Sequence, residues 1–352
     1  GLSARYGRYM QAISGIHYNY SLPEAFWPAY QAIEKTSEPV QKFRSSTYLG
    51  LVRNVRRLDW FLLYLLGASP AVCKSFLAGR ETDLTEFDSG TLYGEHATSL
   101  RMSDIGYQNA RQANLRVSAN SLDDYISDLD RAIRIPSPVW QSLGPDANGE
   151  RRQLNANMLQ IENEFYSTIR PKRVARSGER PTMALRRGGI EYVELRALDV
   201  SPFDPVGINQ RQARFLEMFL LNCLLLDSPP IDGDEHETNV SNHAIVAKRG
   251  REPGLHLRRN GRPISLMDWG MELREQLLAI CEVFDPDGSL GCESAVRECT
   301  AALDDPDRTP AGRLLGELRE TGEPLFVYAM QMARDFGDYF ESLSPAFNAH
   351  TA

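Results

Sequence analysis

The segment GGIEYVELR, residues 188–196, brings together side chains that suit metal and phosphate chemistry. Read as a strand, it projects Ile190, Tyr192, Glu194 and Arg196 to one face, with Glu194 and Arg196 about 7 Å apart along the chain. Such a glutamate can hold Mg²⁺ while the arginine neutralises a phosphoryl group in transfer.

The same two side chains could instead form a surface ion pair, which contributes little to stability. Two neighbouring features favour a site. The pair Gly188–Gly189 lets a ligand or another backbone approach closely. Asp199 and the rigid sequence SPFDP follow directly after the predicted strand.

A second candidate, His17, lies within ISGIHYNYSL, residues 13–22, whose residues alternate as in a strand. One face is apolar, and the other carries Ile13, Gly15, His17, Asn19 and Ser21. A lone histidine commonly has only a structural role. A Gly-x-His-x-Asn strip opposite an apolar face also suits an imidazole that ligates a metal or binds a phosphate.

Basic residues are concentrated between residues 170 and 187, although the chain as a whole is acidic. This segment could be a solvated basic loop. It could also be a mobile clamp for a polyanion, and ATP phosphates suit it better than DNA because it is short and lacks interleaved aromatic residues. We assign Lys172 and Arg173 of this segment, together with Asn19, to ATP phosphate binding.

The sequence ATSLRMSDIGY, residues 97–107, follows a glycine-rich approach and carries an arginine suited to a small acidic ligand. Arg101 could bind a carboxylate through two parallel hydrogen bonds. Tyr107 and Tyr166 could wall a small pocket, or they could pack in the core with outward hydroxyl groups.

Composition excludes several classes of protein. The chain has 352 residues and a net charge of −8, which argues against nucleic-acid binding. No apolar segment reaches the roughly 18 residues of a membrane span. The five cysteines form no CxxC pair, which indicates a reducing compartment, the cytoplasm. The chain starts at Gly1 within an apparent helix, so we expect an N-terminal portion to be missing.

These candidates need a scaffold, and the sequence patterns predict one of class α+β. Predicted strands cover 13–22, 153–166 and 189–195. Predicted helices cover 24–35, 37–66, 70–77, 121–133, a stretch from 210 onward, 265–284, 291–303, 310–320 and 323–342. The few strands and many helices predict an antiparallel sheet with helices packed on one side. We expect residues 1–226 to belong to the catalytic domain and residues 227–352 to form a helical portion packed on it.

Five blocks, taken together, resemble the glutamate–cysteine ligase family of gamma-proteobacterial type. They are ISGIHYNYSLP (13–23), LLGASPAVCKSFL (65–77), ATSLRMSDIGYQN (97–109), LQIENEFYSTIRPKR (159–173) and GGIEYVELRALDVSPFDPVGI (188–208). The resemblance implies a fold similar to the catalytic domain of glutamine synthetase. That fold is a cupped antiparallel sheet with helices on the convex side, here incomplete at the N-terminus.

The resemblance also implies roles for individual residues. His17 and Glu194 would lie at Mg²⁺ sites, with Mn²⁺ as a possible substitute, and Arg196 would contact the transferring phosphate. Ile13, Tyr107 and Tyr166 would line the cysteine pocket, and Arg101 would bind the cysteine carboxylate.

The implied reaction has two steps. The γ-carboxylate of L-glutamate attacks the γ-phosphate of ATP, and the amine of L-cysteine then attacks the resulting acyl phosphate. The product, γ-glutamylcysteine, is the first intermediate of glutathione biosynthesis, and feedback by glutathione would be a family trait. We expect a monomer that binds neither nucleic acid nor membrane.

The chain differs from the family in lacking a further region of roughly 130 residues that would supply acidic metal ligands. We therefore expect little ligase activity from this chain alone. Two alternatives stay open: a related carboxylate–amine ligase with another amine acceptor, and a non-catalytic fragment that binds nucleotide or thiol compounds.

Overall fold

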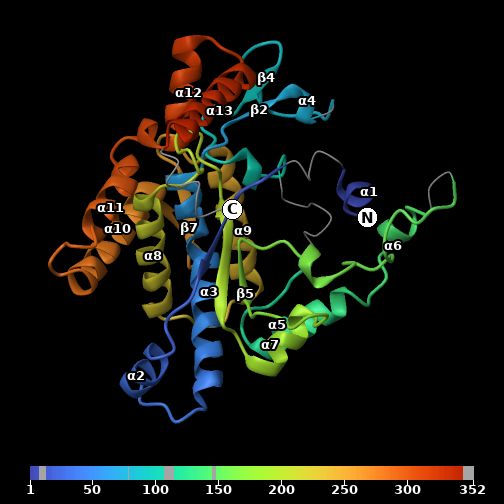
Figure 1. Cartoon of the computed structure of the whole chain (residues 1–352), viewed down its shortest axis with the longest axis vertical. Coiled ribbons are helices and arrows are strands. Elements are labelled where there is room, and N and C mark those ends of the chain that lie inside the picture. The colour runs from blue at the N-terminus through green and yellow to red at the C-terminus, as the bar shows by residue number, and fades with distance from the viewer. Residues whose placement is uncertain (8–12, 78, 107–114, 145–147, 344–352) are drawn as a thin grey trace.

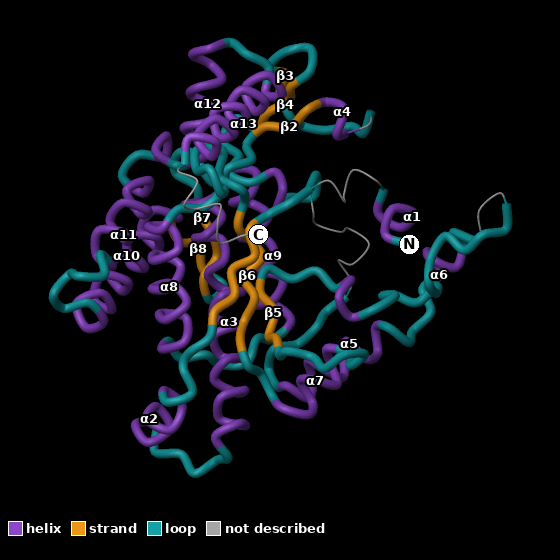
Figure 2. The backbone as a smooth tube through the Cα atoms, in the orientation of Figure 1, coloured by secondary structure: helices purple, strands orange, loops and turns teal. Residues whose placement is uncertain are grey.

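The computed structural model describes residues 1–7, 13–77, 79–106, 115–144 and 148–343. Its main sheet has three antiparallel strands in the order β1-β6-β5 (Figure 2). They are β1 (Ile16–Tyr20), β5 (Ile169–Lys172) and β6 (Tyr192–Leu198). Asn19 and Arg170 are both register partners of Glu194 across this sheet. The predicted α+β class with an antiparallel sheet is confirmed.

The two faces of β6 differ sharply in exposure, as the alternation predicts. Val193, Leu195 and Ala197 are buried, whereas Glu194 and Arg196 on the opposite face are only partly covered. The buried face packs on α3 (Val40–Leu66), the long helix behind the sheet in Figure 1. The polar face of the sheet is therefore the one that can meet a ligand.

Helix α3 organises the core because nearly all of its second half is buried. It ends at Gly67, where an added Cβ would lie 2.4 Å from the carbonyl oxygen of Leu63 and 2.7 Å from that of Thr98. Two helices pack along it, α8 (Gln210–Leu225) and α9 (Gly233–Arg249). Asn209 begins α8 with a capping box that includes Gln212.

A second small sheet and the C-terminal helices lie together at one end of the molecule (Figure 1). This sheet has the order β2-β4-β3, formed by Ala71–Cys73, Thr91–Tyr93 and Thr85–Glu86 respectively. Near it lie α4 (Lys74–Leu77), α12 (Pro310–Thr321) and α13 (Leu325–Ser342). A hairpin of β7 (His256–Arg259) and β8 (Arg262–Ser265) follows α9.

The rest of the described chain contributes further helices and short turns. The helices are α1 (Leu2–Tyr6), α2 (Phe26–Ile33), α5 (Leu122–Ala132), α6 (Pro138–Gln141), α7 (Pro181–Gly188), α10 (Leu266–Phe284) and α11 (Cys292–Thr300). Short 3₁₀ turns cover Leu100–Met102, Glu162–Glu164, Ala301–Leu303 and Pro306–Arg308. Within the described ranges, no helix is long and apolar enough to cross a membrane.

One large hydrophobic cluster extends from Tyr20 to Leu303 and includes residues from both predicted portions of the chain. Trp60 of α3, for example, packs against Trp269 of α10 with ring centroids 4.7 Å apart. The helices after residue 227 thus share a core with the sheet. A smaller cluster joins Leu314, Leu318 and Tyr328 to Phe203 in the segment after β6.

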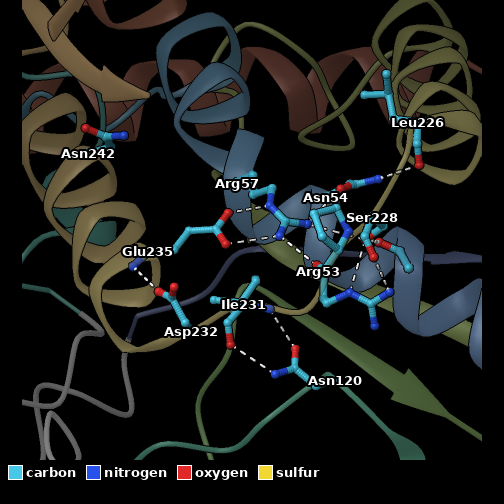
Figure 3. A network of polar contacts seen from close by, with 12 residues as sticks. Arg53, Asn54, Arg57, Asn120, Leu226, Ser228, Ile231, Asp232, Glu235 and Asn242 are labelled. Carbon is cyan, nitrogen blue, oxygen red and sulfur yellow. Dashed lines mark hydrogen bonds and ion pairs between the residues drawn. The ribbon is translucent and has the colours of Figure 1, made fainter. Parts of the chain in front are cut away.

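A polar network, here called the junction network, ties α3 to the segment between α8 and α9 (Figure 3). The Arg57 guanidinium donates to both carboxylate oxygens of Glu235 at 2.5 and 3.1 Å. Arg53 donates to the side chain and carbonyl of Ser228 at 3.1 and 2.7 Å. Asn54 donates to the carbonyls of Cys223 and Leu226. These bonds fix α9 against the core.

Two element predictions are wrong, and one element was missed. Residues 153–166 form irregular backbone with a 3₁₀ turn instead of a strand, because Asn155, Gln160 and Glu164 hydrogen-bond to nearby chain. Residues 71–73 form β2 instead of a helix, because they pair with β4. The β7–β8 hairpin was not predicted.

Candidate functional site

Strands β1 and β6 bring His17, Glu194 and Arg196 together on the polar face of the sheet. His17 Nδ1 lies 3.5 Å from Glu194 Oε1, and Arg196 Nε donates to His17 Nε2 at 3.4 Å. A bulge between Ile16 and Tyr18 adjusts the register where His17 sits. We call the group His17, Asn19, Lys172, Glu194 and Arg196 the sheet-face cluster.

The Glu194 carboxylate lies among three basic side chains without a short contact to any of them. Besides His17, Lys172 Nζ is 3.8 Å and Arg196 Nε is 3.9 Å from its Oε2. Charge-assisted hydrogen bonds are ordinarily about 2.7–2.9 Å long. The carboxylate is thus held electrostatically but is not saturated by hydrogen bonds from these groups.

The environment of His17 favours its neutral form. Burial and the positive charge of Arg196 lower the pKa of His17, and the negative charge of Glu194 only partly opposes this. A neutral imidazole is the form that ligates metals. Ligands of one octahedral Mg²⁺ stand about 3 Å apart. The 3.5 Å between His17 Nδ1 and Glu194 Oε1 fits a shared cation.

Arg196 carries an unsatisfied positive group. Its Nη1 is buried and has no hydrogen-bond partner among the described residues. Its Cζ lies 5.7 Å from the ring centroid of Tyr166. Leaving a buried donor unpaired costs about 1–3 kcal/mol, more for a charged group. An anionic ligand that reached this nitrogen would remove that cost.

No group of three or more histidine, cysteine or acidic side chains within the described ranges could enclose a metal ion. His17 and Glu194 therefore offer two protein ligands. Mg²⁺ is commonly held by one or two protein ligands together with substrate phosphates and water, so this pair is compatible with a substrate-dependent site.

Arg101 lies beyond the end of β6, where it is nearly buried. Its Nε donates to Asp199 Oδ1 at 2.6 Å, and its Nη2 donates to the carbonyl of Arg196 at 3.4 Å. Gly15 provides room for it, since an added Cβ there would lie 2.7 Å from Arg101 Nη1. The predicted carboxylate-binding arginine is thus joined to the sheet-face cluster through the backbone of β6.

The structure describes two of the three residues predicted to line the cysteine pocket, Tyr166 and Ile13. The hydroxyl of Tyr166 contacts the sulfur of Met102 at 3.1 Å, and the Arg196 guanidinium lies over its ring. Ile13 precedes β1 and is partly exposed. Tyr107 lies outside the described residues.

Most arginines of the basic segment 170–187 are engaged by nearby carboxylates. Arg180 pairs with Glu162 and Asp130, and Arg187 pairs with Glu179. Arg173 packs across Gly188, where a Cβ would lie 2.1 Å from its Nε, and donates to the carbonyl of Gly189. The Gly-Gly pair therefore makes room for protein side chains. Two residues of this segment lie beside Glu194: Arg170 is its register partner on β5, and Lys172 places its Nζ 3.8 Å from Glu194 Oε2.

Sequence reasoning did not find the bonding role of Asp199 or the spacing role of Gly15. Asp199 was noted only as a neighbour of the strand. The sequence signal for such a role was the position of Asp199 directly after a strand that carries Glu194 and Arg196.

Comparison with known proteins shows which family the chain resembles. The family model described as glutamate–cysteine ligase matches residues 1–246. A glutamate–cysteine ligase of Alcanivorax borkumensis is 46% identical over 97% of this chain and 66% of the relative. One from Shewanella amazonensis is 48% identical over 99% of this chain and 67% of the relative.

Two solved structures are also similar. The glutamate–cysteine ligase of Francisella tularensis, in complex with AMP, has a TM-score of 0.89 and 34% identity, covering 98% of this chain and 67% of that protein. A bifunctional glutathione synthetase of Pasteurella multocida has a TM-score of 0.69 and 26% identity, covering 95% and 38%. The chain spans about two thirds of the length of the curated relatives, 66% of the first and 64% of the second. The chain belongs to the glutamate–cysteine ligase family.

Proposed function

We propose that this chain takes part in the ATP-dependent joining of the γ-carboxylate of L-glutamate to the amine of L-cysteine, giving γ-glutamylcysteine. The observation that carries the proposal is the buried Arg196 Nη1, which has no partner in the described part of the chain and lies beside the His17–Glu194 pair on one face of the sheet. Family membership supports the reaction class, and the AMP-bound relative supports ATP as the nucleotide.

The first step must overcome the repulsion between a carboxylate and a triphosphate. In this proposal Arg196 donates from Nη1 to an oxygen of the transferring phosphate, where negative charge develops. Glu194 and His17 would hold Mg²⁺, or Mn²⁺ in its place, which supplies further positive charge when bound. Lys172, Arg173 and Asn19 are proposed to contact ATP phosphates from the strands on either side of β6.

The second step needs the cysteine amine close to the activated carbonyl. We propose that Arg101 binds the cysteine carboxylate, with Ile13, Tyr107 and Tyr166 lining the pocket. Holding the amino acid by its carboxylate fixes the direction from which the amine attacks, and such positioning can contribute several kcal/mol to catalysis.

Two broader expectations remain part of the proposal. Residues 1–226 would carry the ligase chemistry, with residues 227–352 packed on the same domain. The five cysteines form no disulfide in the structure, which is consistent with the cytoplasm as the site of action.

Calorimetry with ATP, in the presence and absence of Mg²⁺, tests the proposal directly. We expect Mg²⁺-dependent ATP binding that is lost in Glu194→Gln and Arg196→Gln. The matched controls are Glu293→Gln and Arg297→Gln, which alter an exposed ion pair on α11. Titrations with glutamate and cysteine, followed by a product assay, then address the substrates. Absence of Mg²⁺-dependent ATP binding, or binding unchanged in both site variants, would refute the proposal.

A further inference from the structure

The Asp199 carboxylate is the most densely hydrogen-bonded acidic group near the site. Its side chain is almost completely buried and accepts from four donors. Oδ2 accepts from the backbone N–H of Ala68 at 2.8 Å and from the hydroxyl of Ser69 at 2.7 Å. Oδ1 accepts from the hydroxyl of Ser99 at 2.9 Å and from Arg101 Nε at 2.6 Å.

Three of these donors come from the residues that flank one segment of the chain, residues 70–98. Ala68 and Ser69 precede β2, and Ser99 follows β4, so residues 70–98 leave and return beside Asp199. The hydroxyls of Ser69 and Ser99 also contact each other at 3.3 Å. This part of the arrangement anchors the small sheet to the end of β6.

The fourth donor, Arg101, is held in one orientation. Asp199 occupies its Nε side, the carbonyl of Arg196 accepts from Nη2, and Gly15 leaves just enough room beside Nη1. Nη1 has no hydrogen-bond partner in the described part of the chain. The edge of the guanidinium formed by Nη1 and Nη2 is the edge that binds a carboxylate through two parallel bonds.

We infer that Asp199 is a positioning residue for substrate selection: it fixes Arg101 so that the Nη1–Nη2 edge receives the carboxylate of the amino-acid acceptor. This inference rests on the proposed function, in which Arg101 binds that carboxylate. Without Asp199, the guanidinium group of Arg101 can adopt several orientations. Substrate binding must then order it, which weakens the affinity for the substrate.

A purely structural role for Asp199 makes a different prediction. In that case, its replacement would weaken the anchor of residues 70–98 and lower stability, but it would not change which acceptor is preferred. The distinguishing quantity is therefore the ratio of affinities for cysteine and cysteamine, since cysteamine has the same amine and thiol but no carboxylate.

Calorimetry would measure both affinities in the 352-residue chain with Mg²⁺ and a non-hydrolysable ATP analogue. We expect the wild-type chain to prefer cysteine and Asp199→Asn to reduce the preference about 10- to 100-fold, mainly by weakening cysteine binding. Ser99→Ala removes another bond to the same carboxylate without touching Arg101, so it should leave the ratio within about 2-fold of wild type.

A second variant covers the case in which Asp199→Asn does not fold. Gly15→Ala leaves the bonds from Ala68, Ser69 and Ser99 to Asp199 in place. Its methyl group would lie 2.7 Å from Arg101 Nη1 and 2.7 Å from the carbonyl oxygen of Leu198, so Arg101 must shift and the preference for cysteine should also fall. Circular dichroism and thermal unfolding establish that each variant is folded.

The outcomes separate the inference from the proposed function. A folded Asp199→Asn or Gly15→Ala variant with an unchanged ratio overturns the inference while leaving the proposed function in place. A wild-type chain that binds Mg-ATP but shows no preference for cysteine overturns the role of Arg101, and the inference with it. A wild-type chain that binds neither Mg-ATP nor cysteine overturns the proposed function itself.

Discussion

Two arginine–carboxylate groups in this molecule are built from the same residue types but differ in how fully they are paired. In the junction network, Arg53 and Arg57 place their nitrogens 2.5 to 3.3 Å from acceptors. In the sheet-face cluster, the contacts of Glu194 and Arg196 measure 3.4 to 3.9 Å, and Arg196 Nη1 has no partner among the described residues.

This difference in hydrogen bonding distinguishes a network with a structural role from a cluster that can bind a ligand. Short hydrogen bonds hold α3, α8 and α9 in place (Figure 3) and engage every guanidinium nitrogen of Arg53 and Arg57. The sheet-face cluster keeps bonding capacity for a ligand, and the rigid sheet and α3 behind it support its open bonding groups. The comparison can be tested by removing one group from each region.

The largest effect is expected at Arg196. Arg196→Gln removes the unpaired donor, so the affinity for Mg-ATP should fall about 30- to 1,000-fold, which corresponds to about 2–4 kcal/mol. The free energy of unfolding should stay the same or rise, because a buried N–H donor with no acceptor among the described residues disappears. Calorimetry and urea unfolding measure the two quantities. A large loss of stability with unchanged affinity would place Arg196 with the structural arginines.

Glu194 should show a smaller effect that depends on the metal. Glu194→Gln removes a ligand charge, so affinity for ATP in the presence of Mg²⁺ should fall about 10- to 100-fold. Affinity for ATP without Mg²⁺ should stay the same or rise, because a negative charge beside the phosphates is gone. Equal losses with and without Mg²⁺ would argue against metal binding at this carboxylate.

Arg57 should behave in the opposite way. Arg57→Ala leaves Glu235, Asn54 and the carbonyl of Pro229 without their donor, so the free energy of unfolding should fall by about 2–3 kcal/mol. Affinity for Mg-ATP should remain within about 2-fold. Arg297→Ala, in an exposed pair on α11, is the control and should change stability little. A loss of nucleotide affinity in Arg57→Ala would break the distinction between the two regions.

The smallest effect on stability is expected at the buried pair of His243 and Asp59. His243 Nδ1 lies 3.1 Å from Asp59 Oδ2. Burial alone would lower the pKa of His243, but the charge of Asp59 and the carbonyl of Met102 raise it above its ordinary value.

The sign of the resulting pH dependence follows from linkage. A raised folded-state pKa contributes stability that is fully present below the unfolded value of about 6.5 and is lost as pH rises through the folded pKa. The stability difference between wild type and His243→Gln should therefore shrink as pH rises from 5.5 to 8.5. Urea unfolding across that range measures it, and a difference that grows with pH would contradict the assignment.

The parts of the fold that follow local periodicity could be predicted from the sequence. Alternation placed His17 with Asn19, and Glu194 with Arg196, on polar faces, and the structure brings these faces together in one sheet. Ser121 caps α5 as its residue type indicates, accepting from the backbone of Asp124.

The parts that depend on distant pairing could not be predicted in this way. Residues 71–73 form a strand only because β4 returns beside them, and Pro70 suggested a helix start. In residues 153–166 polar alternation resembled a strand, but Arg5, 148 residues away, donates to Gln153 there. By contrast, the β7–β8 hairpin had a signal in the sequence, the dipeptide Asn260–Gly261, which is typical of a hairpin turn. In the structure these two residues have positive φ angles of 52° and 75°.

The roles of Asp199 and Gly15 depend on contacts across the chain. Nothing near position 199 in the sequence shows that donors from 68, 69, 99 and 101 meet one carboxylate. Such convergence is a property of the folded molecule.

A crystal structure of the chain with Mn²⁺ and a non-hydrolysable ATP analogue would test the central claim most directly. The account predicts an anomalous peak about 2–2.5 Å from the Glu194 carboxylate and from His17, with Arg196 Nη1 bonded to a phosphate oxygen. Nucleotide and metal bound away from this face, with Arg196 Nη1 still unpartnered, would contradict it.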